Sequence, residues 1–544
     1  MRTTHLTQAS CNARLLQAGL FVMLCAMLVF QGRSLFVFPQ PNGLRWFGDE
    51  TWLMSEAHAQ ISEGVVRYPL AVGTPLFHAK GIVLGMTWLS ALLYGLPTLI
   101  FRGDIVAIGR IVTFVLGLTL LNIIYRVGRK WSIDPVAILF ALILLVGGRA
   151  FFFASHSCRT DILAGLIVTA VVLYFEGRWR SGNRAFEPRG WLLFGIAMTA
   201  LGLTSSIHLL TLLLPLSLYY LWRFGGLRSL NAVGSAVLGS LLCFGLLVGI
   251  YVLTTHSHSL FGQSSGNMQF QDVLHDVPIF RPLSRSVQFA NIAIRYHFLL
   301  DEAPAFLAIL VVLAAFALAK RFSKRENPLS ESIGIPLVIV IMSWLLLSGA
   351  QVTYAMHVLP LLTFAFALTI SPYLYRTNGG WLRLGIIIVT IATGTLCIRD
   401  STLALANGTR IANSNRDGIG RIASTILSEA NREPRPRVVV EPPALDGLSQ
   451  YASLDVVTDH FISFPERDQS LEEYLRKNGI RYLVLYNSPC YPKNRPLVDS
   501  FYIGVKKLTI PTLTVAGMSG DMGRNYFGDP DTFQDTLLLF KVRD

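Results

Sequence analysis

The chain has 544 residues, of which 52% are hydrophobic and only 15% are charged. Membrane-length apolar runs recur from Leu16 to Ile398, which predicts a polytopic α-helical membrane protein. The formal net charge of +13 does not indicate nucleic-acid binding, because the arginines and lysines lie in short loops between the apolar runs. The six cysteines are scattered without a C-x-x-C pair, which excludes a readable zinc motif or disulfide framework.

The hydropathy pattern predicts about eleven membrane spans. The first is expected to be a retained helix and not a signal peptide, since no small-x-small cleavage site follows it and more spans do. In chain order the spans cover roughly residues 16–32, 105–125, 134–153, 162–177, 190–205, 207–222, 232–254, 303–319, 333–349, 354–371 and 381–398.

Basic residues in alternate loops orient these spans. The cluster from Arg126 to Lys130 and the later clusters alternate with loops that carry almost no positive charge, so we expect the N-terminus and the basic loops to be cytoplasmic. The alternation holds only if Gly81–Phe101 does not cross the membrane. This apolar segment, which contains Gly95 and Pro97, is therefore predicted to be a re-entrant or interface-lying helix in the first external loop, residues 33–104.

The same count divides the chain into two domains. Residues 1–398 form the predicted membrane domain, which has a second large external loop at residues 256–302. Charges return after Ile398, and residues 399–544 are predicted to form a small soluble α/β domain on the external side. Because the acids Asp49-Glu50 and Asp161 fall in external segments, we expect them to share one face of the membrane.

Three segments of the tail indicate its α/β character. Arg437–Glu441 and Arg481–Tyr486 have the apolar character of short buried strands. Ser470–Asn478 has the pattern of an amphipathic helix, and the following Gly479 is typical of a helix end.

The adjacent acids Asp49 and Glu50 are the first candidates for chemistry. They follow Phe47 and Gly48 at the predicted membrane edge, in a chain with few charges. Partial desolvation there raises a carboxylate pKa, so Asp49 suits a general base that takes a proton from an acceptor hydroxyl. The alternative is that Asp49 caps the amphipathic helix predicted at Thr51–Ile61.

A second acid, Asp161, lies in the short external loop before the span that starts at Ile162. It could act with Asp49 or could cap that helix. The neighbouring Arg159, like Arg149, is a cation at the outer end of a span, where a lipid phosphate would lie. The alternative for both arginines is snorkelling to lipid headgroups.

Other external residues suit a phosphate ligand. His78 and Lys80 directly precede the interfacial apolar segment, where a compact cation can neutralise a phosphate or pyrophosphate, although interface anchoring also explains Lys80. Arg295 and Tyr296 are candidates from the second external loop. Tyr354 and His357 open a late span at its external end; His357 is either a satisfied bundle histidine or a residue that supports the acids.

These features resemble the GT-C membrane glycosyltransferases, in the branch of the protein O-mannosyltransferases and the bacterial lipid A aminoarabinose transferase. The resemblance rests on Phe47-Gly48-Asp49-Glu50, on His78 and Lys80 before an apolar juxtamembrane helix, on Arg159-Thr160-Asp161, and on the segment Tyr354–Pro360. It covers the layout from about residue 15 to residue 400. The chain departs from the family where Lys-Pro-Pro or His-Pro-Pro is usual, because Gly81 follows Lys80.

The resemblance implies an inverting transfer of a sugar from a polyprenyl-phosphate donor to an external lipid, glycan or protein hydroxyl, in a bacterial inner membrane. Asp49 would be the general base with Glu50 beside it, and Asp161 would orient the acceptor or a basic partner. The donor phosphate would be bound by His78, Lys80, Arg159, Arg295 and Tyr296. No cofactor is indicated, although a divalent cation is compatible with the family; no nucleic-acid partner is expected.

Three alternatives remain: a transporter or flippase, an O-antigen ligase or polymerase, and a non-catalytic scaffold whose tail binds a partner. A secondary transporter or lipid flippase would place ionisable residues near the bilayer midplane and usually shows two repeated halves, whereas the acids here lie at one rim and no repeat is visible. An O-antigen ligase or polymerase would depend more on external arginines and histidines than on an early acid pair.

Overall fold

The structure is a computed structural model of the whole chain. It describes residues 2–35, 54, 57, 88–101, 105–158, 160–182, 188–202, 208–224, 230–255, 333–347, 352–374, 379–430, 435–440, 448, 451–458, 479–487, 509–512 and 535–541.

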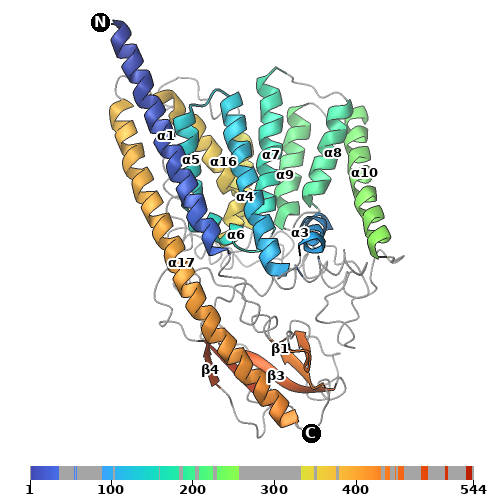
Figure 1. The fold of residues 1–544 in the computed structure, drawn as a ribbon. Helices are drawn as coiled ribbons and strands as arrows, with labels where there is room; N and C mark the ends of the chain where they lie inside the picture. Colours follow the sequence, from blue (N-terminus) through green and yellow to red (C-terminus); the bar gives the residue numbers. More distant parts are fainter. Residues whose placement is uncertain are drawn as a thin grey trace.

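Most of the described residues form a helical bundle with a small β-sheet beyond one of its ends (Figure 1). The bundle helices are α1 (Arg2–Ser34), α4 (Ile105–Lys130), α5 (Pro135–Val146), α6 (Arg149–Ser155), α7 (Asp161–Arg180), α8 (Pro188–Gly202), α9 (His208–Arg223), α10 (Leu230–Thr255), α15 (Gly334–Leu347), α16 (Leu359–Ile370) and α17 (Gly379–Ala430). The remaining ones are α3 (Trp88–Ile100) and two 3₁₀ helices, η3 (Val352–His357) and η4 (Ser371–Tyr373).

Two of these helices form the buried centre of the bundle. Every residue of α16 is buried, and so is every residue of α5 after its first, Pro135. A helix that is apolar on all sides lies in a protein core or in lipid, and the burial of α5 and α16 places them inside the bundle. The start of α5 is well defined, because the Asp134 carboxylate accepts a hydrogen bond from the backbone N–H of Val136 and Pro135 takes the first helical position.

One end of the bundle, here called the sheet-proximal end, is held together by a polar network. The Gln31 amide near the end of α1 donates to the carbonyl of Val146 at 2.7 Å and to Cys397 Sγ of α17 at 3.4 Å. Ser34 Oγ lies 2.7 Å from Nε2 of His156, which follows α6. The ends of α1, α5 and α6 therefore meet at one level along α17 (Figure 1).

The opposite end gathers basic residues. Arg129 and Lys130 lie in the last turn of α4, Arg180 in the last turn of α7, and Arg223 in the last turn of α9. Arg223 donates to the buried Glu176 carboxylate at 3.1 Å and stacks on Trp179 with its guanidinium carbon 4.4 Å from the ring centre. This arrangement agrees with the prediction that the basic turns lie on one face of the membrane.

The predicted span at residues 134–153 is interrupted. Gly147 and Gly148 separate α5 from α6, and the two helices bend by 69°. A Cβ at Gly147 would overlap the Thr393 side chain of α17, so glycine permits α17 to approach the bend closely. The bend turns α6 across the sheet-proximal end and toward η3.

The segment predicted not to cross the membrane is described from Trp88 onward as α3. This helix has 13 residues and contains Pro97, so its length is about 20 Å and too short to span a bilayer. Figure 1 shows α3 nearly end-on at the sheet-proximal end, across the direction of the bundle helices, where it packs on α4. The part described therefore agrees with an interface-lying helix; residues 81–87 lie outside the described residues.

Helix α17 continues without interruption for 52 residues, from the bundle to the sheet (Figure 1). Its C-terminal part packs on the sheet through Ile419, Ile422, Ala423 and Ile426, which follow helical spacing on one face. The boundary expected from composition at residues 398/399 thus falls inside this helix. Charge returns there, but the helix does not end.

The sheet has the strand order β2-β1-β3-β5-β4. The strands β1 (Arg437–Val440), β2 (Asp455–Thr458) and β3 (Ile480–Asn487) are parallel, whereas β5 (Asp535–Lys541) runs antiparallel to β3 and to β4 (Thr509–Thr512). Strands β1 and β3 confirm the two predicted strands. Gly479, just before β3, has φ +66°, which suits the predicted helix end, but residues 470–478 lie outside the described residues.

Membrane-spanning capacity is clear for several helices. Among the described residues, four are long and apolar enough to cross a bilayer, and a fifth span results if α5 and α6 count together. These four helices contain the segments Ala13–Ser34, Ile105–Lys130, Asp161–Arg180 and Gly380–Thr409. The protein is therefore an integral membrane protein, while the total of about eleven spans stays a prediction.

Close packing of α8 on α10 provides a test of the fold. A Cβ at Gly195 would overlap the Ala236 carbonyl oxygen, whereas a Cβ at Gly234 would meet nothing within 4 Å. We expect Gly195→Ala to destabilise the protein by about 1–3 kcal/mol through overpacking. Gly234→Ala should be neutral or stabilising by up to about 1 kcal/mol, because alanine favours a helix. Thermal unfolding of the purified variants measures both; equal melting temperatures would contradict the α8–α10 packing.

Candidate active site

Asp161 is the first residue of α7 and is buried, with 3% of its surface exposed. The N-cap position belongs to Thr160, whose side chain makes no capping hydrogen bond. The interpretation of Asp161 as a simple cap is therefore not supported. A carboxylate in the first turn is stabilised by the helix dipole, and a buried one also needs a specific partner.

One group within ion-pair distance of Asp161 is His357, at the end of η3. Its Nε2 lies 3.4 Å from Asp161 Oδ1, and only 1% of the His357 surface is exposed. Helix η3 packs against both α6 and α7, so it brings His357 to the start of α7. The structure thus brings together two residues that the sequence had singled out separately.

A glycine permits this contact. Gly165 lies one helical turn after Asp161 and faces η3, where a Cβ would overlap the Met356 carbonyl oxygen and would touch Pro360. Only a residue without a side chain lets the η3 backbone approach α7 so closely. Gly165 therefore helps to set the separation of Asp161 and His357.

The loop before Asp161 is fixed by His156, which is fully buried. Its Nδ1 lies 2.7 Å from the Phe152 carbonyl oxygen, and its Nε2 lies 2.9 Å from the Gln31 carbonyl oxygen and 2.7 Å from Ser34 Oγ. Burial lowers the pKa of His156 to about 4, so the ring is neutral at pH 7. A neutral ring carries one N–H, so it donates to one of these two carbonyl oxygens, from Nδ1 or from Nε2 according to its tautomer.

Arg110 is a buried cation near this site that was not among the residues singled out from the sequence. It lies in the second turn of α4 and has the largest fully buried side chain among the described residues. Its charge contributes to lowering the pKa of His156, which places it near the loop that leads to Asp161. The available signal was a single arginine inside an otherwise apolar predicted span, since intramembrane cations are expensive and mostly functional.

The segment that follows the first acid pair also reaches this end. Met54 and Ala57 are helical and buried, and they cluster with Tyr94, Val106 and Cys158. The contact is close, because a Cβ at Gly109 would overlap Met54 Sδ and Cys158 Sγ. Two residues of the predicted amphipathic helix thus pack against the loop that precedes Asp161.

Most of the other candidate site residues lie outside the described residues. Tyr354 lies in η3 three residues before His357, and its side chain is not described. The candidates outside the described residues are Asp49, Glu50, His78, Lys80, Arg159, Arg295 and Tyr296. Asp161 and His357 are potential metal ligands, but within the described part of the chain no group of three or more His, Cys, Asp or Glu residues could hold a metal ion.

Comparison with known proteins identifies the fold. No protein-family model and no curated protein matches the sequence. In structure, the chain is similar to ArnT from Cupriavidus metallidurans bound to undecaprenyl phosphate, with TM-score 0.53 and 12% identity over 96% of this chain and 98% of that one. The chain has a GT-C membrane glycosyltransferase fold. The resemblance expected from the sequence is thereby confirmed, and at this identity the likeness defines the fold alone.

Two further solved structures are more distantly similar. The apo state of ArnT from Cupriavidus metallidurans gives TM-score 0.46 and 12% identity over 96% of this chain and 98% of that one. The S. cerevisiae protein O-mannosyltransferase Pmt1-Pmt2 complex bound to the sugar donor gives TM-score 0.30 and 17% identity over 47% of this chain and 35% of that one. The GT-C fold assignment rests on the first comparison.

Gly165 tests the geometry of the Asp161–His357 pair. We expect Gly165→Ala to push η3 away from α7 at a cost of about 1–3 kcal/mol, which exposes His357. Its modification by diethyl pyrocarbonate, followed by peptide mass spectrometry, should then be about tenfold faster. Gly177→Ala is the control on the same helix, because its Cβ would make an ordinary contact with Trp131 at 3.5 Å. Similar rates in both variants would contradict the proposed role of Gly165.

Proposed function

We propose that the protein is an inverting glycosyltransferase that moves a sugar from a polyprenyl-phosphate donor to a hydroxyl on the external side of the membrane. The observation that carries this proposal is the buried pair of Asp161 and His357 at the sheet-proximal end of a GT-C fold. The related ArnT structure holds undecaprenyl phosphate, which supports a lipid phosphate as the leaving group here.

Asp49 is the proposed general base. Its carboxylate takes the proton of the acceptor hydroxyl as that oxygen forms a bond to the anomeric carbon of the sugar. The bond from this carbon to the phosphate oxygen breaks on the opposite face, so the configuration inverts and the polyprenyl phosphate leaves with the electron pair. Glu50 lies next in sequence and is proposed to support the same carboxylate.

Chain length supports a common location for the two acids. Met54 lies against Cys158, and Cys158 is three residues before Asp161. Asp49 is five residues before Met54, so even a fully extended segment keeps it within about 18 Å of that position. This distance is compatible with a shared pocket at the sheet-proximal end, and a helical turn between the two residues would shorten it.

Asp161 and His357 are proposed to hold the acceptor or the donor in position. A carboxylate beside an imidazole can accept a hydrogen bond from a sugar or acceptor hydroxyl. We propose that the negative charge that develops on the leaving phosphate is stabilised by His78, Lys80, Arg159, Arg295 and Tyr296. One well-aimed cation typically contributes a few kcal/mol to such a step.

The orientation follows from the basic ends of the helices. We place the end with Arg129, Lys130, Arg180 and Arg223 in the cytoplasm and the sheet-proximal end, with the tail domain, outside, as in a bacterial inner membrane. The buried Asp161 at the sheet-proximal end supports the proposal of an enzyme with an external site. A secondary transporter or flippase is not favoured, because the fold match is to a GT-C protein.

Substitution of Asp49 tests the proposed base. In membranes supplied with a polyprenyl-phosphate sugar, Asp49→Asn should reduce transfer by about 100-fold or more, because an amide cannot accept the proton. Asp417→Asn is the matched control, since Asp417 is exposed on α17 far along the helix from the site. Wild-type transfer by Asp49→Asn at equal protein level would refute the assignment.

Asp161 and His357 should behave differently from Asp49. We expect Asp161→Asn and His357→Gln each to raise KM and lower kcat together, because the pair positions a substrate and does not take the proton. If kcat and KM are unchanged in Asp161→Asn, Asp161 has only a structural role.

A further inference from the structure

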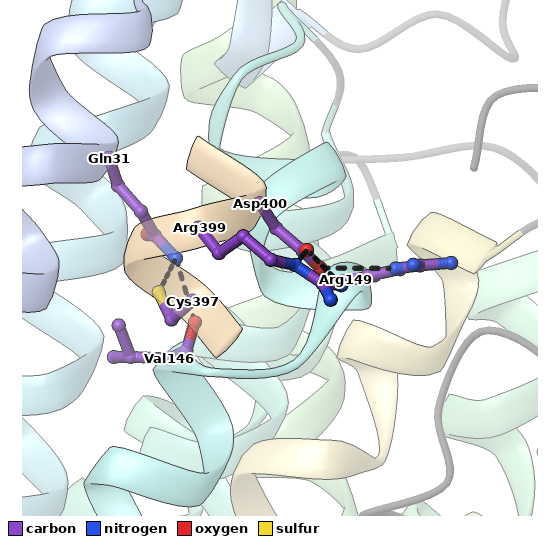
Figure 2. Close-up of polar contacts among 6 residues, drawn as sticks. All are labelled: Gln31, Val146, Arg149, Cys397, Arg399 and Asp400. Atoms are coloured by element: carbon purple, nitrogen blue, oxygen red, sulfur yellow. Dashed lines mark hydrogen bonds and ion pairs between the residues drawn. The ribbon is translucent and has the colours of Figure 1, made fainter. Parts of the chain in front are cut away.

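Three charged side chains meet where α17 leaves the bundle. The Asp400 carboxylate accepts hydrogen bonds from Arg399 Nε and Nη2 at 3.1 and 2.8 Å through Oδ1. Its other oxygen, Oδ2, lies 3.5 Å from Nε of Arg149, the first residue of α6. Figure 2 shows the two guanidinium groups on either side of this carboxylate. We call these three residues the outer arginine cluster.

The cluster lies at the depth of the lipid headgroups. The apolar segment of α17 runs from Gly380 to Thr409, and Arg399 and Asp400 are its first charged residues after Arg383. Asp400 lies 20 residues, or about 30 Å of helix, after Gly380. This length equals the thickness of the hydrocarbon core of a bilayer. The same level is marked by Gln31 and Cys397, where α1 ends beside α17 (Figure 2). Phosphate groups are therefore the anions that the cluster meets first.

Helix α17 faces lipid along the approach to this cluster. Ile388, Ile391 and Leu396 are 58%, 54% and 49% exposed, and helical spacing places Arg399 on the same stripe, 56% exposed. In Figure 1, α17 and α1 form one edge of the bundle. A phosphate at Arg399 would therefore come from the surrounding bilayer and not from a pocket inside the bundle.

The charge of the cluster favours an anion. Arg399 contacts Asp400 and keeps 56% of its side chain exposed, so this guanidinium group can still reach an anion, whereas Asp400 and Arg149 are largely shielded from water, at 16% and 29% exposure. Guanidinium groups match the oxygens of a phosphate in geometry as well as charge. Asp400 holds the two guanidinium groups together, which reduces the conformational entropy lost when a ligand binds.

We propose that the outer arginine cluster binds the phosphodiester of an anionic phospholipid of the external leaflet, with Asp400 as the positioning residue. Such a lipid would fasten α17 to α6. Because α6 leads to the loop before Asp161 and packs on η3, the bound lipid would stabilise the sheet-proximal end. This inference concerns a second lipid site and does not depend on sugar transfer.

The experiment compares lipids on the full-length chain in detergent. We expect phosphatidylglycerol to raise the melting temperature more than phosphatidylcholine does, and native mass spectrometry to show about tenfold tighter retention of phosphatidylglycerol, equivalent to 1.4 kcal/mol. Arg399→Gln should abolish this preference, and Arg149→Gln should weaken it. Arg421→Gln is the control, because Arg421 is also exposed on α17 but lies beyond the apolar part.

Three results would overturn the proposal. The first is equal binding of the two lipids by the wild-type protein, and the second is an unchanged preference in Arg399→Gln. The third is discrimination by these variants of undecaprenyl phosphate but not of phosphatidylglycerol, which would assign the cluster to the lipid carrier. If Arg149→Gln fails to fold, the exposed Arg399→Gln variant still decides. None of these outcomes depends on transferase activity.

Discussion

A carboxylate buried at the edge of a membrane domain must have a partner, and this constraint organises the sheet-proximal end of the bundle. The Asp161 carboxylate lies within ion-pair distance of His357 and in the first turn of α7, where the helix dipole stabilises a negative charge. The contact requires η3 to lie directly on α7, which Gly165 permits. The acid is thus held by two elements that are distant in the sequence, and its position is fixed before any substrate binds.

The rest of this end serves to keep those two elements in place. His156 ties the loop before Asp161 to α1, and the bend between α5 and α6 turns the chain toward η3. Helix α17 passes the same level and contacts α6 through Asp400. Its uninterrupted course connects the bundle directly to the sheet.

The sequence predicted the class of fold, because membrane-length apolar runs and alternating basic loops follow from bilayer thickness and charge alone. It also identified Asp161 and His357, which stand out against apolar surroundings. Their contact could not be predicted, since it depends on a backbone approach at Gly165. The bend was missed although Gly147 and Gly148 are a local signal for a break in a helix. The continuation of α17 past Arg399 was missed because the return of charged residues does not end a helix. Arg110 was missed although its charge inside an apolar run was visible.

The proposed mechanism requires the early acid pair and the Asp161–His357 pair to face the same external cavity at the donor phosphate. A cryo-electron microscopy structure of the chain in a lipid nanodisc with undecaprenyl phosphate tests this arrangement most directly. We predict the phosphate at the sheet-proximal end, with Asp49 and Asp161 lining one cavity. A phosphate bound at the opposite end, near Arg223 and Glu176, or Asp49 and Asp161 in separate cavities, would contradict it.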